Sequence, residues 1–261
     1  MSPPRRAKAD GPPALTLLPP GLEGLEAAFL IAASYFTSAM TAAFGIGGGV
    51  TLLALMGPVV PVAALIPVHG VVQLGSNAGR AWHMRRLAAP PILVPFLVGS
   101  LAGAFLGALL VVELPDTALK LILGLFVLAV TWLKLPALAF ASPGVMAIGG
   151  LASTFATMFV GATGPLVNAL FARSFADRGK LVANAALAMS FQHGLKVAAF
   201  GALGFAFWKW VPVIAAMIAT GYLGTITGAR ILSVVPERVF RRVFKLLLTL
   251  LALDLIRRAL L

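Results

Sequence analysis

Long apolar segments separated by short polar turns dominate the chain from residue 25 onward. A helix rises about 1.5 Å per residue, so about 20 apolar residues cross the roughly 30 Å hydrocarbon core of a bilayer. The pattern therefore predicts an all-α integral membrane protein that is surrounded by the lipid bilayer. The long segments are 25–44, 62–82, 90–112, 117–134, 143–160, 182–204, 208–230 and 240–256.

Two further apolar stretches, 48–57 and 165–172, are only about half as long as a membrane span, and each follows a glycine-rich break. Broken backbone cannot face hydrocarbon, so half-length helices in a membrane must be buried in protein or line a cavity. We therefore expect 25–57 and 143–172 to form re-entrant helical hairpins, each broken at its glycines.

Features of the first half of the chain recur in the second. This recurrence predicts a first membrane repeat at 22–138 and a second at 139–261. Residues 1–21 are Pro-rich and contain no long apolar run, so we expect a disordered tail there. In transporters built from two such halves, the substrate site lies where the halves meet. Gly103, Gly107, Pro115 and Asp116 recur, each 121 residues later, as Gly224, Gly228, Pro236 and Glu237.

Loop charges predict how the two repeats are oriented. The turn at 83–86 is basic, whereas its counterpart carries only Lys209; residues 57–61 are uncharged, whereas their counterpart 173–180 is basic. Basic loops stay on the cytoplasmic side, so equivalent loops of opposite charge bias belong on opposite sides. This predicts an inverted repeat in which each half has one re-entrant hairpin and three transmembrane helices. The alternative is eight plain crossings with parallel repeats.

Composition supports a single membrane domain. Hydrophobic residues make up 60% of the chain, charged residues 11%, and the mean hydropathy is +1.01. The net charge of +12 lies mostly in short loops, where it sets orientation and meets anionic lipid headgroups, so we predict no nucleic-acid partner. The absence of cysteine excludes disulfides and thiol chemistry. The expected location is the inner (plasma) membrane, with multiple passes.

The two glycine breaks are the first candidate binding elements. A helix that begins inside the membrane directs unpaired N–H groups and the positive end of its dipole into the protein. Two such N-termini meeting near the midplane would bind an anion. The alternative is that the glycines only allow tight helix crossings. The candidate residues are Gly45, Gly47, Gly48, Gly49, Gly161 and Gly164, and Asn168 on the second half-helix could add a polar contact.

Polar residues inside two long segments are the second set of candidates. Lys196 lacks an acidic neighbour in sequence, and an uncompensated lysine at the centre of a membrane helix costs about 2.5–3.5 kcal/mol. An anionic substrate could be its partner; the other interpretations are snorkelling or pairing with backbone carbonyls at a helix end. The substrate-binding candidates are Gln73, Ser76 and Asn77, on a helix face shared with Arg80, and Ser190, Gln192, His193 and Lys196.

His69 and His193 could couple protons to transport, although a hydrogen-bonded structural role is favoured for both. Apart from Asp254, the acidic residues lie outside the apolar segments' centres, which disfavours a sodium or calcium site, and we predict no metal and no cofactor. GxSxG, HExxH and GxxxxGK[ST] are all missing from the sequence, so an enzyme is not predicted. An intramembrane dyad of Ser76 or Ser190 with His193 remains the alternative from a different class.

Gly99, Gly103 and Gly107 form a small-residue helix face, and Gly224 and Gly228 make a shorter copy. Such faces let two membrane helices approach closely. We favour packing within the chain, and pairing of two copies in a homodimer is the other role left open.

Several of these motifs together resemble the TauE/SafE-type sulfite exporter family of membrane permeases, over about residues 25–253. They are GIGGG at 45–49, HMRR at 83–86, GSLAGAFLGALL with LPDTALKLILGLFVLAVTWLKL, and GYLGTITGARILSVVPERVFRRVFKLLLTLLAL. The resemblance implies a small permease, most simply an exporter, for sulfur-containing anions such as sulfite, sulfoacetate or other organosulfonates. A transporter or channel for a carboxylate or sulfate is the alternative. The family motif maps onto Gly45, Gly47, Gly48 and Gly49.

Overall fold

The computed structural model describes residues 18–19, 21–44, 47–111, 115–133, 142–172, 174–175, 177–231 and 237–261. The predicted tail at 1–21 and Gly45 of the first break therefore lie wholly or largely outside the described residues. All regular structure in the described part is helical. The first five α-helices are α1 (Gly24–Phe44), α2 (Gly48–Met56), α3 (Val62–His83), α4 (Pro90–Val111) and α5 (Asp116–Trp132).

The remaining five are α6 (Pro143–Val160), α7 (Gly164–Phe171), α8 (Arg178–Ala202), α9 (Val211–Ile231) and α10 (Glu237–Leu260), and short 3₁₀ turns occupy η1 (Arg85–Leu87) and η2 (Phe207–Trp210). Each long apolar segment and each half-length stretch predicted from the sequence is thus a helix. Bilayer thickness fixes the length that such segments must have, which is why their bounds can be read from hydropathy.

By length and composition, α1, α4, α6 and η2 with α9 are long and apolar enough to cross a membrane. The other long helices differ for two reasons. In α3 and α8, polar residues such as Gln73 and Gln192 are buried inside the protein rather than exposed to lipid. In α5 and α10, the spans are shorter or flanked by charged ends.

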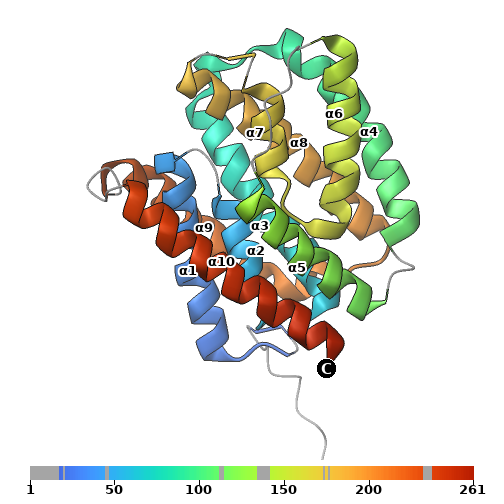
Figure 1. The fold of residues 1–261 in the computed structure, drawn as a ribbon, viewed down its shortest axis with the longest axis vertical. Coiled ribbons are helices and arrows are strands. Elements are labelled where there is room, and N and C mark those ends of the chain that lie inside the picture. Colours follow the sequence, from blue (N-terminus) through green and yellow to red (C-terminus); the bar gives the residue numbers. More distant parts are fainter. Residues whose placement is uncertain are drawn as a thin grey trace, which may run out of the picture.

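The glycine faces hold two helix pairs together. Gly99 and Gly103 on α4 lie against the backbone of Ala147 and Leu151 on α6, so close that a Cβ at either glycine would overlap a carbonyl oxygen. In the same way Gly224 on α9 lies against the backbone of Tyr35 on α1. Figure 1 shows α4 and α6 side by side. The predicted packing role is therefore confirmed, and both faces are occupied within the chain.

Contacts along these pairs fix the directions of the helices. Successive glycines of α4 meet successive turns of α6, so α4 and α6 run parallel, and α1 and α9 run parallel for the same reason. The turn at η1 joins α3 to α4, and Asn184 near the start of α8 bonds to Ala89 N and Leu87 O at that turn (2.8 and 3.1 Å). Gly75 and Gly79 of α3 lie against Ile218 and Tyr222 of α9, so α9 runs parallel to α3. Hence α1, α3 and α9 run toward the η1 end of the molecule, whereas α4, α6 and α8 run away from it.

The outer surface suits a bilayer. The exposed side chains of α4 are apolar, and exposed tryptophans lie near both ends of the helices. Trp82 is at the η1 end and Trp208 at the other, and a basic side chain stacks on each ring. Tryptophans in two such belts are typical of the two membrane–water interfaces. The exposed apolar residues of α4 include Val94, Val98, Leu101, Phe105 and Leu109.

Candidate functional site

The N-terminal ends of the two half-length helices meet at one small cavity. Gly47 precedes α2 with φ 99°, and Gly161 ends α6 with φ 73°; both angles favour glycine. Pro165 lies in the first turn of α7, where its missing N–H leaves no bond unmade. The cavity has a volume of about 30 Å³ and is lined by Thr41, Gly47, Gly49, Val50, His69, Gln73, Asn77, Arg80, Ala162, Gly164, Pro165, Asn168, Met189 and His193.

No side chain caps the start of either half-helix. Gly47 has no side chain, and the Thr163 hydroxyl makes no capping bond to α7. The first N–H groups of an α-helix have no partner within the helix, and they carry the positive end of the dipole. Two uncapped helix starts facing one cavity make that cavity favourable for a negative charge.

Arg80 brings a formal charge to the cavity. The side chain is 5% exposed, and its guanidinium donates to Asn77 Oδ1 at 3.1 Å and to Ser76 Oγ at 3.4 Å, both one turn back on α3. Its Nε has no partner. No carboxylate is among the residues that line the described cavity. A buried guanidinium without a carboxylate partner is favoured only if an anion can approach it.

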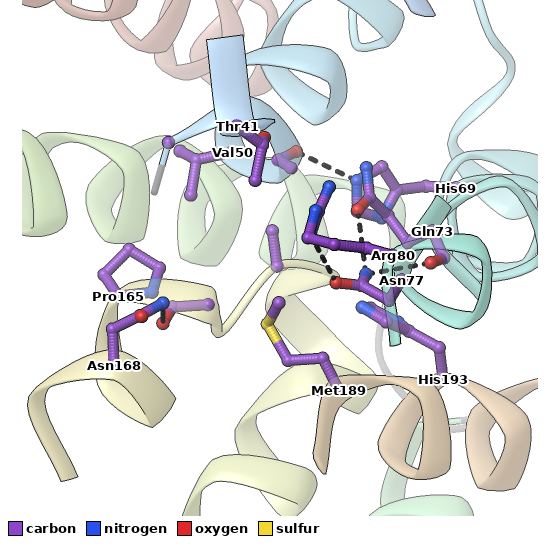
Figure 2. A pocket seen from close by; sticks show the side chains of 14 residues that line it. Thr41, Val50, His69, Gln73, Asn77, Arg80, Pro165, Asn168, Met189 and His193 are labelled. Atoms are coloured by element: carbon purple, nitrogen blue, oxygen red, sulfur yellow. Dashed lines mark hydrogen bonds between the residues drawn. The ribbon is translucent and has the colours of Figure 1, made fainter. Parts of the chain in front are cut away.

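Amide and imidazole groups complete the wall. In Figure 2 the labelled side chains of α3 face Pro165 and Asn168 of α7 across the cavity, with Met189 and His193 of α8 on a third side. Asn77 Nδ2 donates to Gln73 O at 2.8 Å. His193 Nδ1 is buried without a partner. These groups offer hydrogen-bond donors around an anion whose negative charge the helix ends and Arg80 would balance.

Each break is also held by a basic side chain. His69 Nε2 donates to Gly49 O at 2.9 Å, which fixes the start of α2. Lys196 is 0% exposed, and its Nζ donates to Gly161 O at 2.8 Å, which fixes the end of α6. The structure therefore matches the interpretation of Lys196 as paired with a backbone carbonyl at a helix end. Lys196 is not among the residues lining the cavity.

Half of the described sequence candidates lie in the cavity wall, and the other half lie behind it. Gly47, Gly49, Gln73, Asn77, Gly164 and His193 line the cavity. Those behind it support the wall: Gly48 lies against Thr37 and Thr41, Ser76 bonds to Ser38 and Arg80, Gly161 accepts from Lys196, Ser190 donates to Ala186 O, and Gln192 donates to Ser153 and Thr154.

Some wall residues were not among the sequence candidates. Arg80 had a visible signal, because it lies one turn beyond Ser76 and Asn77 on the same helix face. Asn168 was noted only as an added polar contact. Thr41 on α1 and Met189 on α8 carry no pattern in the sequence that separates them from packing residues, and only the fold brings them to the cavity.

The wall presents hydrogen-bond donors and a positive charge, the groups that proteins use to bind anions. Within the described ranges, no group of three or more His, Asp or Glu side chains could hold a metal ion. Neither Ser76 nor Ser190 hydrogen-bonds to His193; their hydroxyls bond to Ser38 and Arg80, and to Ala186 O, respectively. The cavity offers N–H donors and one guanidinium, without an activated nucleophile among these contacts.

Comparison with known proteins agrees with this chemistry. A family model described as sulfite exporter TauE/SafE matches residues 30–255, which includes both glycine breaks and all residues lining the cavity. No curated protein and no solved structure matches the chain. The family consists of multi-pass membrane transporters for small anions and not of enzymes. The chain therefore belongs to the sulfite exporter TauE/SafE family.

Proposed function

We propose that this protein exports a small sulfur oxyanion, such as sulfite or an organosulfonate like sulfoacetate, across a bacterial-type inner membrane. The observation that carries the proposal is the convergence of two uncapped helix N-termini and the guanidinium of Arg80 on one cavity without a carboxylate among its described lining residues. Membership of the sulfite exporter family supports the same substrate class.

The sulfonate or sulfite oxygens would divide between backbone and side-chain donors. N–H groups at the starts of α2 and α7 take two sides of the anion, and Arg80 takes a third with a charge-assisted bond. Gln73, Asn77 and Asn168 orient the remaining oxygens. A cavity of about 30 Å³ holds on the order of two water molecules, so a compact oxyanion group fits it best.

Lys196 acts in this scheme as a positioning residue. Its ammonium stabilises the carbonyl of Gly161, at the break that sets the direction of α7, and adds positive potential behind the wall. Removal of Lys196 would therefore weaken anion binding through the geometry of the break as well as through the lost charge.

The helix directions support an inverted repeat of residues 22–138 and 139–261. The helices α1 and α3 run opposite to α6 and α8, which hold the equivalent places in the second half. In this arrangement each half would supply one full helix, one half-helix and three further crossings. Alternating access would come from movement of one set of helices against the other around the fixed cavity.

The first test is counterflow of labelled sulfite and sulfoacetate in proteoliposomes. The native chain is expected to exchange at least one of the two, and Arg80→Gln should weaken apparent affinity by about 10- to 100-fold, because a charged hydrogen bond contributes about 1.5–3 kcal/mol. Arg80→Lys, which keeps the charge, should retain part of the activity. Normal exchange by folded Arg80→Gln would remove Arg80 from the site.

Another small anion is the second candidate substrate, because backbone N–H groups and a guanidinium also bind carboxylates and sulfate. The same vesicles with a panel of carboxylates, sulfate and sulfonates separate these. Exchange of a carboxylate alone would contradict the sulfur substrate while leaving the site intact. Anion conductance without counterflow would indicate a channel.

A further inference from the structure

A second and larger cavity lies next to the first, and the two share one residue. Its volume is about 640 Å³, and it is lined by the end of α1, by α3 and η1, by the start of α8 and by α9. Arg80 lines both cavities, and it is the residue that their two described linings have in common. His83 and Arg86 line the larger cavity on the far side of Arg80 from the half-helix ends.

The larger cavity belongs to the basic end of the molecule. Arg86 and Leu87 in its wall are part of the η1 turn, which packs on the start of α8 through Asn184. No carboxylate lines this cavity within the described residues. Basic loops mark the cytoplasmic side of membrane proteins.

The other side of the small cavity is closed by packing. From the cavity, α2 leads into a cluster of buried apolar side chains that includes Leu52, Leu53, Val68 and Ala162. At the far end of α2, Gly57 lies against Leu255 of α10. The small cavity therefore has a wide neighbouring cavity with basic side chains in its wall on one side, and a close-packed apolar region on the opposite side.

We propose that the larger cavity is an anion vestibule, through which a sulfur oxyanion enters from the basic side, with Arg80 as the gate to the inner site. The vestibule gathers anions by the potential of Arg86 and Arg80 within low-dielectric walls. The Arg80 side chain, whose Nε lacks a partner, then turns with the anion from one cavity to the other. This inference rests on the proposed function. It means that, in the described conformation, the inner site is accessible from the basic side of the membrane.

Thiol labelling tests the vestibule directly, because the chain contains no cysteine and any introduced one is unique. Val182→Cys and Thr225→Cys place a thiol in the vestibule wall, on different helices, and Leu203→Cys places one near the opposite end. Each is exposed, in sealed vesicles of both orientations, to a sulfonate-bearing and to an ammonium-bearing methanethiosulfonate. The ratio of the two rates is normalised to the ratio at Leu203→Cys.

The vestibule predicts labelling of both wall positions from the basic side only, with the normalised ratio favouring the anionic reagent by about tenfold. Equal ratios, a cationic preference, or labelling from the opposite side would overturn it. Two independent wall positions keep the test open if one variant fails to insert.

A matched pair of arginines provides the transport readout. Arg86 lines the vestibule, whereas the neighbouring Arg85 stacks on Trp82 outside it. Arg86→Gln should slow uptake from the basic side about three- to fivefold at low anion concentration and leave the saturated rate unchanged, whereas Arg85→Gln should change it less than twofold. Equal effects of the two variants would overturn the guiding role. Absence of any sulfur-anion exchange by the native chain would contradict the proposed function instead. The thiol labelling would still test the vestibule independently of that result.

Discussion

Lys196 reaches the Gly161 carbonyl by passing directly over Gly70 of α3. A Cβ at position 70 would lie 2.8 Å from Lys196 Cε, so the bare backbone of Gly70 makes the path of the lysine possible. The lysine and the glycine are therefore one unit, formed by α3 and α8 together. Their dependence on each other can be measured.

Gly70→Ala should lower stability by about 1–3 kcal/mol, because it pushes Lys196 from its carbonyl. In a Lys196→Ala background the same change should cost little, since the obstacle is gone. Thermal unfolding in detergent over the double-mutant cycle gives the coupling. Gly194→Ala is the control, because its Cβ would meet only Leu74 Cδ1 at 4.0 Å. If the losses of stability from Gly70→Ala and Lys196→Ala were additive, the two residues would not depend on each other.

Lys196→Met separates positioning from direct binding. Methionine keeps most of the side-chain volume but cannot donate to Gly161 O, so the break loses one of two donors, the other being Thr157 Oγ1 at 3.1 Å. Apparent anion affinity should fall by about 3- to 10-fold, which is less than for Arg80→Gln. The measurement is exchange against substrate concentration for both variants. A larger loss for Lys196→Met would place the anion at Lys196.

Whether the sequence could predict a residue of the candidate site depends on how distinctive its local pattern is and on where its side chain ends. The half-helix ends were predictable, because a glycine break in an apolar run has few uses in a membrane. The source of the charge was not, because Arg80 and Lys196 both lie on polar faces and a one-dimensional sequence does not say where a long side chain ends. Thr41 and Met189 were invisible, since nothing local distinguishes them from packing residues.

At the scale of helices, lengths and breaks were predictable and partners were not. The glycine faces indicated close packing, but a small-residue stripe does not name the helix that it meets. In the structure α4 packs on α6 and α9 packs on α1, so each glycine stripe contacts a helix from the other half of the chain. Only three-dimensional contacts carry that information.

Gly103→Leu and Gly224→Leu should each force a helix pair apart. A side chain at Gly103 would overlap the carbonyl of Leu151, and one at Gly224 would overlap that of Tyr35, neither of which can move without its helix. We expect each variant to lose folded protein, measured as the monodisperse fraction after extraction. Gly144→Ala, with nothing within 4 Å of its Cβ, should behave as the native chain. Native yields for the leucine variants would contradict the packing.

At the scale of the whole molecule, the distribution of charge predicts the orientation in the membrane. Basic residues predominate toward the η1 end, where Arg85, Arg86, Lys180 and Arg242 lie together with the acidic Asp177, whereas acidic and basic residues are evenly mixed at the other end. Cysteine at position 86 or 180 should react with an impermeant maleimide from the cytoplasmic side, and cysteine at position 209 from the opposite side. Labelling of positions 86 and 180 from different sides would exclude the inverted repeat.

The packing of α1 on α9, which lie far apart in the sequence, has a consequence for biosynthesis. Ser34 on α1 donates to Met217 O, and Tyr35 bonds to Thr227. During synthesis α1 can therefore make these contacts only after α9, which lies about 190 residues later in the chain, has been made. Until then the polar side chains of α1 must either remain in the bilayer without hydrogen-bond partners or bind another protein temporarily. Long-range pairing of this kind slows folding. A nascent chain stalled before residue 211 would thus be a natural client for membrane insertion chaperones.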